Sequence, residues 1–150
     1  MALAQADISA PLRVAMADDD TAEHMLIQMA ADQAELDADF SFYECGEDLL
    51  SNLRNIAHPN DLPQIIILDL RMPGLDGYAT LDQLHGDPAL WAIPVVVLTS
   101  SAREAERSLS LSRGASLFQE KPEDFSKLVS LARGLPLLAI CWDGAITSNR

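Results

Sequence analysis

The sequence predicts one α/β domain, built on a doubly wound, five-stranded parallel β-sheet with helices on both faces. Two runs of branched apolar residues, Ile65–Leu68 and Val95–Leu98, lack the polar alternation of a half-exposed strand. Such runs are typical of strands that are buried on both faces of a parallel sheet. Strand-like runs alternate with helix-like segments from about Leu12 to Gly134, which is the pattern of parallel α/β domains. This alternation leaves no room for a second domain.

The composition argues against a nucleic-acid-binding or membrane protein. Hydrophobic residues make up 49% of the 150 residues, enough for one domain with a hydrophobic core. The net charge of −13 argues against binding to a phosphate backbone, which requires clustered Lys and Arg. No apolar run approaches the roughly 20 residues that span a bilayer. The start of the chain lacks the basic region of a secretory signal. We therefore expect a cytoplasmic protein with both cysteines reduced.

The first two strands are predicted before residue 46. Leu12–Ala17 is a short apolar run followed by three aspartates, and Phe40–Cys45 has the composition of a second strand. Between them, Asp20 and Glu23 resemble the cap pair of a helix N-terminus. Four apolar residues follow at helical spacing: Met25, Leu26, Met29 and Ala30. A further helix is expected from about 47 to 56.

The other three strands are also followed by helices. The third strand, Ile65–Leu70, leads through "RMPGLDG" into a helix. The fourth, Val95–Leu98, precedes a Ser-rich helix at about 102–113. A fifth strand at about 116–119 is followed by a final helix that begins near Phe125. The sequence therefore alternates strand and helix five times.

Chemically reactive side chains follow four of the five predicted strands. The carboxyl ends of parallel strands meet at one edge, so residues far apart in sequence come together there. The residues expected at this edge are Asp18, Asp19, Asp20, Asp69, Thr99, Ser100 and Lys121. Clustered carboxylates repel one another unless a cation shares the site, and hard oxygen ligands favour Mg²⁺ or Mn²⁺. A carboxylate beside such a metal, a lysine and a hydroxyl can receive a phosphoryl group, and Asp69 is the predicted acceptor.

Four motifs at these strand ends carry a family resemblance. They are "ADDD" after the first strand, "LDLRMPGLDG" around Asp69, "VVVLTSS" at Thr99 and "FQEKP" at Lys121. With these motifs in this order, nearly the whole chain resembles the receiver domain of two-component response regulators, of the chemotaxis-regulator type. The resemblance implies the flavodoxin-like receiver fold, with the strand order 2-1-3-4-5.

The resemblance also implies a role for each site residue. The metal ligands would be Asp18, Asp19, Asp69 and the backbone carbonyl of Arg71. Asp69 would be phosphorylated by a histidine kinase, and Thr99 and Lys121 would bind the phosphoryl oxygens. Phe118 corresponds to the aromatic switch residue whose ring turns inward when Thr99 moves. The peptide between Lys121 and Pro122 is commonly cis in this family.

These roles lead to an expected function and two alternatives. The chain would be a single-domain response regulator, a regulatory phosphoacceptor and not an enzyme, although it would assist its own phosphotransfer and autodephosphorylation. Phosphorylation would add about −1.5 to −2 charges and change the surface of the fourth helix, fifth strand and fifth helix. That surface would bind a protein target or a second copy. The first alternative is a phosphorelay intermediate that passes the group to a histidine phosphotransfer protein. A flavodoxin-like cofactor module is disfavoured, because no phosphate-binding loop follows the first strand.

The two ends of the chain extend the receiver. We expect an N-terminal extension at 1–11, the receiver at 12–134 and a C-terminal tail at 135–150. Pro136 should end or kink the last helix. The tail is apolar enough to need cover, from the domain or from a second copy in a homodimer, through Leu137, Leu138, Ile140 and Trp142. The tail and the long loop before the third strand loosely resemble single-domain receivers of bacteriophytochrome kinases, which makes such a kinase a hypothetical partner.

Some polar residues are expected to lie outside this site or to play a lesser part in it. Asp20 is interpreted as a helix cap. The Arg71 side chain could reach the phosphoryl site from two residues beyond Asp69 and tune the lifetime of the group. The three histidines are expected to be solvated: His24, His58 and His85.

Overall fold

The computed structural model of the protein describes residues 10–101 and 103–148, with side chains as far as residue 140. The strands are β1 (Leu12–Ala17), β2 (Ala38–Tyr43), β3 (Ile65–Leu68), β4 (Val95–Thr99) and β5 (Leu117–Glu120). The helices are α2 (Thr21–Gln33), α3 (Gly46–Arg54), α4 (Gly77–Gly86), α5 (Glu104–Ser112) and α6 (Phe125–Ser148), with a short 3-10 helix η1 (Pro59–Asp61). Each strand is followed by a helix, as the sequence predicts.

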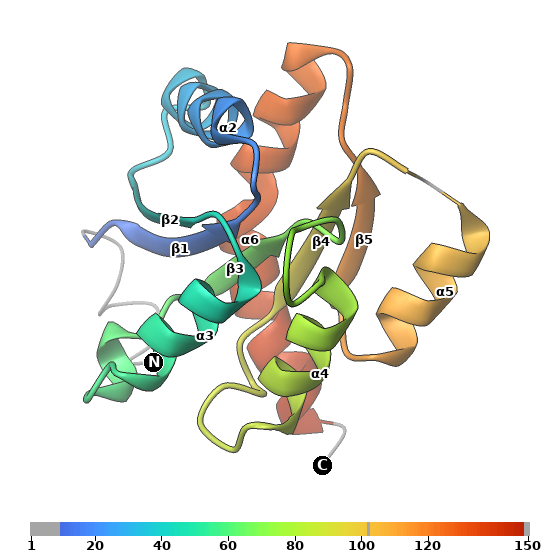
Figure 1. Cartoon of the computed structure of the whole chain (residues 1–150). Helices are drawn as coiled ribbons and strands as arrows, with labels where there is room; N and C mark the ends of the chain where they lie inside the picture. The colour runs from blue at the N-terminus through green and yellow to red at the C-terminus, as the bar shows by residue number, and fades with distance from the viewer. Residues whose placement is uncertain (1–9, 102, 149–150) are drawn as a thin grey trace.

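The strands form one parallel sheet in the order β2-β1-β3-β4-β5, which confirms the predicted fold class and strand order. Helices α2 and α6 cover one face of this sheet, and α3, α4 and α5 lie on the other (Figure 1). The central strands β1 and β3 are therefore enclosed on both sides. This explains why their sequences lack the polar positions of a half-exposed strand.

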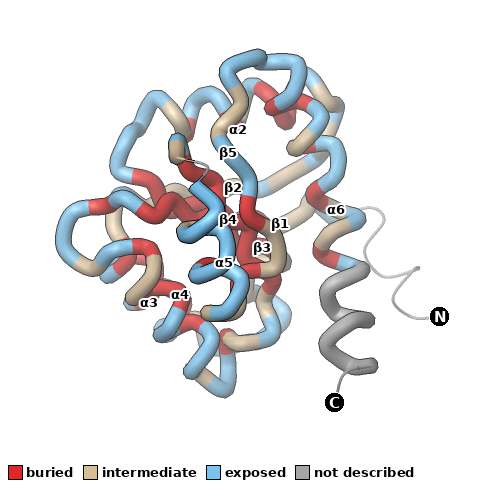
Figure 2. Tube along the Cα trace, turned by 90° about the vertical axis from the view of Figure 1, so that its right-hand side faces the viewer, coloured by how far each residue is buried: buried red, intermediate tan, exposed pale blue. Residues whose placement is uncertain are grey.

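The core consists of two layers that share the central strand β3. Ile66 and Leu68 contribute to the layer under α3 and α4, whereas Ile65 and Ile67 contribute to the layer under α2 and α6. All four side chains are fully buried, each worth about 1.5 to 3 kcal/mol relative to an exposed position. Figure 2 shows this buried centre, with exposed residues mainly on the helices and loops around it.

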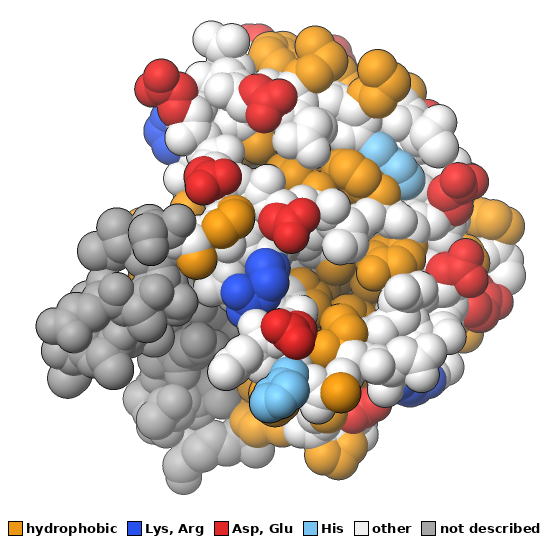
Figure 3. Space-filling view, turned by 90° about the vertical axis from the view of Figure 1, so that its left-hand side faces the viewer, with side chains coloured by type: hydrophobic (Ala, Val, Ile, Leu, Met, Phe, Trp, Pro, Cys, Tyr) orange, Lys and Arg blue, Asp and Glu red, His pale blue; other side chains and the backbone are white. Residues whose placement is uncertain are grey.

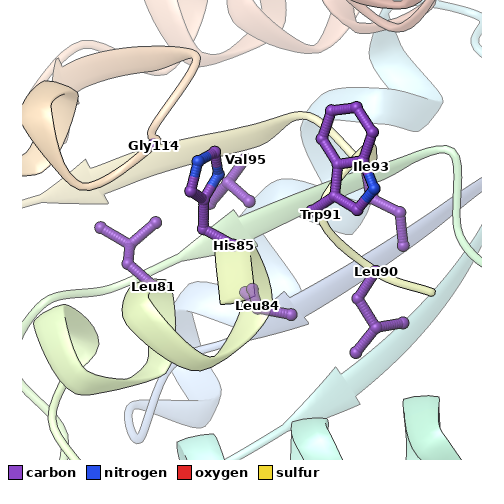
Figure 4. Close-up of a pocket in the computed structure, with 8 residues that line it drawn as sticks. All are labelled: Leu81, Leu84, His85, Leu90, Trp91, Ile93, Val95 and Gly114. Atoms are coloured by element: carbon purple, nitrogen blue, oxygen red, sulfur yellow. The ribbon is translucent and has the colours of Figure 1, made fainter. Parts of the chain in front are cut away.

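A small apolar cavity lies beside α4 and the beginning of β4. Its volume is about 10 Å³, and the side chains that line it include Leu84, Trp91 and Val95 (Figure 4). This is space for roughly one water molecule, so the cavity is a gap in packing and not a ligand site. In the described part of the chain, no helix has the length and apolarity required to cross a membrane.

Helix α2 buries a different side from the one that its apolar residues indicate. Met25, Leu26 and Met29 are 67%, 38% and 52% exposed. The buried residues of the helix are His24, Ile27, Ala30 and Ala31. Small alanine side chains let α2 lie close to the sheet and to α6, and this close packing decides which side faces inward. The prediction that His24 is solvated is therefore wrong, whereas His58 and His85 are exposed as expected.

Helix α6 continues through Pro136, where the sequence predicts an end or a kink, and runs without interruption to Ser148. Leu135 and Ala139, one turn apart on either side of the proline, are both buried, so the helix packs inward before and after Pro136. Leu137 and Ile140 point outward and are 66% and 56% exposed. The expected boundary between receiver and tail thus falls inside a continuous helix. The side chain of Trp142 and residues 1–9 of the extension lie outside what the structure describes.

Candidate functional site

The strand register brings Asp18 and Asp69 together at the carboxyl edge of the sheet. Ala17 of β1 pairs with Leu68 of β3, and each aspartate is the next residue in its chain segment. The backbone N–H of Asp69 donates to the carbonyl of Ala17 at 3.0 Å, and that of Asp18 donates to Tyr43 at 3.0 Å. These two bonds extend the sheet contacts by one residue. They fix the positions at which the Asp18 and Asp69 side chains project from the edge of the sheet.

Three of the predicted ligands form a compact acidic cluster. Carboxylate oxygens of Asp18, Asp19 and Asp69 all lie within 4.8 Å of one another. Asp18 and Asp69 are buried at 1% and 6% exposure, whereas Asp19 is exposed. Oxygen ligands on one Mg²⁺ lie about 3 to 4 Å apart when each is about 2.1 Å from the ion. A small inward movement of these side chains would meet that geometry, so the donor set fits a hard divalent cation.

Lys121 lies between the two buried carboxylates. Its Nζ is 2.9 Å from Asp18 Oδ2 and 3.6 Å from Asp69 Oδ2. The backbone N–H of Lys121 donates to the carbonyl of Thr99 at 2.7 Å, which anchors the residue at the end of β5. Burial works to lower the pKa of Lys121, but the hydrogen bond and charge of Asp18 and the charge of Asp69 outweigh it and raise the pKa. Lys121 is therefore charged at neutral pH.

Asp69 titrates far above an ordinary aspartate. Burial and the neighbouring charge of Asp18 raise its pKa from 3.8 to about 6, although Lys121 and the Arg71 backbone N–H work in the opposite direction. The N–H of Arg71 lies 3.4 Å from Asp69 Oδ1. A raised pKa means that the folded protein holds this carboxylate under electrostatic stress. A nearby cation would relieve that stress.

The predicted hydroxyl and aromatic residues lie on the two neighbouring strands. Thr99 ends β4 and is fully buried, and its Oγ1 has no hydrogen-bond partner among the described residues. Unpaired buried hydroxyls are uncommon, because burying one without a partner costs free energy. Phe118 lies on β5 at 4% exposure, in the layer under α3 and α4. The ring is thus already in the core in this conformation.

Two expectations about neighbouring residues have opposite outcomes. Asp20 caps α2 as predicted, since its side chain accepts a hydrogen bond from the N–H of Ala22 at 3.0 Å. The peptide between Lys121 and Pro122 is not cis, as no described peptide bond is. The trans form is the more stable one even before proline, by about 0.5 to 1 kcal/mol.

Three residues near the site have contacts that sequence reasoning missed. His24 Nε2 lies 2.8 Å from the carbonyl oxygen of Asp18. Glu47 accepts a hydrogen bond from the N–H of Leu75 at 3.0 Å, in the segment that follows Asp69. Glu106 of α5 pairs with the Arg71 guanidinium at 2.8 Å. Only His24 carries a local signal: it lies four residues after Asp20, so one helical turn returns it to the end of β1.

Acidic side chains are also spread over the outer surface. On the face drawn in Figure 3 they alternate with hydrophobic side chains, and few Lys or Arg lie between them. This agrees with the net charge of −13. The Lys121 ammonium in the acidic cluster is therefore a positive charge in a molecule whose net charge is strongly negative.

Comparison with known proteins identifies the family to which the chain belongs. The family model of the response regulator receiver domain matches residues 14–133. The response regulator PleD of Caulobacter vibrioides is 43% identical over 75 residues, which are 50% of this chain. They are 16% of PleD, so the chain spans only a small part of that relative's length.

Two solved structures extend the likeness over most of the chain. The phosphorylated cyanobacterial phytochrome response regulator RcpA is 27% identical, with a TM-score of 0.74 and coverage of 84% of this chain and 91% of its own. The Mn²⁺-bound response regulator Rcp1, a protein of Synechocystis, is 26% identical, with a TM-score of 0.72 and coverage of 83% and 91%. Receiver domains bind Mg²⁺ or Mn²⁺ in an acidic pocket, and the cluster of Asp18, Asp19 and Asp69 is compatible with that role. The chain belongs to the response regulator receiver domain family of two-component systems.

Proposed function

We propose that this protein is a response regulator in which Asp69 accepts a phosphoryl group from a histidine kinase and that it signals through protein contacts. One observation carries the proposal. The buried Asp69 carboxylate lies among two other carboxylates and 3.6 Å from the ammonium of Lys121, with an elevated pKa of about 6. A structural carboxylate would be expected to accept several hydrogen bonds, whereas Asp69 accepts one long hydrogen bond among the described residues, from the N–H of Arg71 at 3.4 Å.

The transfer is an in-line displacement at phosphorus. An Asp69 oxygen attacks the phosphorus of a phosphohistidine, the new O–P bond forms and the N–P bond breaks. The imidazole nitrogen keeps the electron pair of the broken bond and takes up a proton. When bound, Mg²⁺ or Mn²⁺ supplies positive charge that offsets the repulsion between the carboxylate and the phosphoryl oxygens. The groups that would hold it are the carboxylates of Asp18, Asp19 and Asp69 and the backbone carbonyl of Arg71.

Lys121 and Thr99 would then bind the product. Lys121 is 2.9 Å from Asp18 Oδ2, and it would exchange part of this contact for a phosphoryl oxygen. Thr99 would donate its unpaired hydroxyl to another phosphoryl oxygen, which would satisfy a buried group that has no partner among the described residues. Movement of Thr99 would change the packing of Phe118, and with it the face formed by α5, β5 and α6.

This face would pass the signal to a protein partner or a second copy. A groove of about 720 Å³ runs along β5 and the start of α6, between Gln119 and Leu131. Leu109 on α5 and Leu137 and Ile140 on α6 are exposed apolar residues that could be covered in a homodimer through this face and the tail. A phytochrome-type kinase is the proposed donor, because RcpA is by its description a phytochrome response regulator. The cytoplasm is the proposed compartment. No observation favours the phosphorelay alternative.

Intact mass measured after incubation with acetyl phosphate and Mg²⁺ tests the proposal. The native chain should gain one phosphoryl group, and Asp69→Asn or added chelator should abolish the gain. Asp76→Asn is the matched control, because Asp76 is an exposed cap of α4 seven residues further on, and asparagine caps helices equally well. An adduct that survives Asp69→Asn, or no adduct on folded protein, would contradict the proposal.

A further inference from the structure

The ion pair between Arg71 and Glu106 connects the segment after Asp69 to helix α5. Arg71 Nη2 lies 2.8 Å from Glu106 Oε2, the shortest of the three arginine–carboxylate pairs among the described residues. Glu106 is the more withdrawn partner, with a side chain 19% exposed against 56% for Arg71. Its other oxygen, Oε1, is buried without a hydrogen-bond partner in the described structure. Glu106 therefore depends on this one arginine.

The ion pair between Arg54 and Asp87 differs from this one in the number of partners that the carboxylate has. Asp87, which pairs with Arg54 at 3.3 Å, also accepts a hydrogen bond from the N–H of Ala89 through its second oxygen. Both of its oxygens are satisfied. Loss of the arginine would leave Asp87 with a partner, but it would leave Glu106 with none among the described residues.

Arg71 is also placed to serve a second anion. Its backbone N–H lies 3.4 Å from Asp69 Oδ1, so the side chain starts next to the proposed acceptor. A phosphoryl group at Asp69 would add about −1.5 to −2 charges and three strong acceptor oxygens. Guanidinium groups bind such oxygens in a bidentate manner. Glu106 offers Arg71 one contact, so the phosphoryl group would be the stronger competitor.

We propose that Glu106 and the phosphoryl group compete for Arg71, so that Glu106 holds the arginine away from Asp69 until phosphorylation takes it over. The proposal rests on Asp69 being the phosphoacceptor. Glu106 is then a positioning residue, because it acts on the site only through Arg71. When Arg71 leaves, the half-buried Glu106 carboxylate loses its counter-charge, and α5 is driven to move Glu106 into solvent.

The remaining contacts of α5 would act as a hinge for this movement. Arg113, just after α5, pairs with Asp82 of α4 at 3.0 Å, and its guanidinium lies 5.4 Å from the ring centre of Tyr78. Arg107 lies 3.3 Å from the carbonyl of Phe118 on β5. These contacts hold the end of α5 and its β5 side. The ion pair between Arg71 and Glu106 holds the side of α5 that faces the segment after Asp69.

Beryllofluoride with Mg²⁺ is the probe, because it binds to a carboxylate as a phosphoryl analogue and its affinity can be measured by titration calorimetry. Glu106→Gln should bind beryllofluoride about two- to fivefold more tightly than the native chain, the range expected for a partly exposed ion pair. Arg71→Gln should bind it more weakly. The double variant should bind like Arg71→Gln alone, since Glu106 acts only through Arg71. Asp82→Asn removes a different partner of α5 and should leave the affinity unchanged, and Glu106→Asp should stay close to native.

Hydrogen exchange in α5 gives a second readout. Beryllofluoride should raise amide exchange across residues 104–112 in the native chain. In Arg71→Gln the exchange should be high from the start and should not rise further. A gain from Glu106→Gln that persists without Arg71, or no change in α5 exchange on binding, would overturn the competition while the phosphoacceptor proposal stands. Failure of the native chain to bind beryllofluoride and to form an acetyl phosphate adduct would instead overturn both.

Discussion

His24 Nε2 lies 2.8 Å from the backbone carbonyl oxygen of Asp18, and its ring stacks on Phe42 with centroids 4.7 Å apart and planes 15° apart. A ring N–H that donates to this carbonyl fixes the end of β1, where the acidic pair begins. The contact links the first turn of α2 to the metal ligands. The hydrogen bond and the stacking contact together satisfy the buried imidazole.

Replacing His24 with phenylalanine should weaken metal binding while preserving the stack on Phe42. Loss of one hydrogen bond at the end of β1 would lower Mg²⁺ affinity about two- to tenfold. The quantity to measure is the Mg²⁺ dissociation constant, by calorimetry. His58→Phe is the control, because His58 is exposed in a loop. Equal affinities of His24→Phe and the native chain would show that the contact does not position the ligands.

Asp69 should make the metal-free protein less stable as pH rises. Its pKa is about 6 in the folded protein and 3.8 is its ordinary value, so folding favours the protonated form. The contribution is absent below about pH 4, grows between pH 4 and 6, and reaches its full destabilising value above about pH 6. Its size is about 1 to 3 kcal/mol.

Urea unfolding with chelator at pH 4.5 and pH 7, in parallel with Asp69→Asn, checks this dependence. The variant should be more stable than the native chain at pH 7, and the difference should shrink at the lower pH. Saturating Mg²⁺ should reduce the advantage of the variant. A difference that does not vary with pH would mean that Asp69 is not under electrostatic stress.

Lys121→Gln should slow phosphorylation by acetyl phosphate about ten- to hundredfold, because a charged hydrogen bond to the phosphoryl group is lost. The rate is read from the mass of the adduct over time. Lys127→Gln is the matched control, since Lys127 is an exposed lysine of the same groove that takes no part in the acidic cluster. Similar slowing in both variants would point to general surface charge instead of Lys121 itself.

Gly77→Ala should destabilise the protein and disturb the segment after Asp69. A Cβ at Gly77 would collide with Leu70 Cα and lie 2.7 Å from the Asp69 carbonyl oxygen, and both are backbone atoms that cannot rotate away. We expect a loss of about 1 to 3 kcal/mol in the free energy of unfolding. A Cβ at Gly86, at the other end of α4, would have no atom of the described residues within 4 Å, so Gly86→Ala should be neutral or stabilising. A neutral Gly77→Ala would show that α4 can move away from β3 freely.

The exposed side of α6 should contribute to self-association. Replacing both Leu137 and Ile140 with glutamate places charges on two positions that are 66% and 56% exposed, so the fold should be retained. Sedimentation of the phosphorylated or beryllofluoride-bound protein should then show a weaker dimer than the native chain. A native chain that remains monomeric at high concentration would remove the proposed dimer.

Local sequence patterns predicted the sheet because runs of branched apolar residues are compatible with few structures other than a strand buried on both faces. Four consecutive branched apolar residues, Ile65–Leu68, can be covered only between two helical layers, and both layers are found. The same reasoning located the acidic cluster, because parallel strands bring their carboxyl ends to one edge whatever the distance in sequence. Asp18, Asp69, Thr99 and Lys121 each follow or end a strand, so knowing the strands was sufficient to bring them together.

The side on which a helix packs was not predictable in this way. Helix α2 has apolar residues on more than one side, and its alanines, not Met25 and Met29, face the core. The fate of Pro136 likewise depended on Leu135 and Ala139, whose burial keeps the helix continuous. Both outcomes arise from packing between elements that are distant in sequence.

By itself, the sequence determined the fold class, the edge at which the chemistry lies and the residues that meet there, because these follow from short-range patterns and sheet geometry. Only the tertiary structure decided which polar groups outside the acidic cluster contact the residues in and beside it. His24 reaches Asp18 because α2 turns that side inward, and Glu106 reaches Arg71 because α5 lies beside the segment after Asp69. Such contacts depend on how helices settle on the sheet, and no local pattern specifies that position.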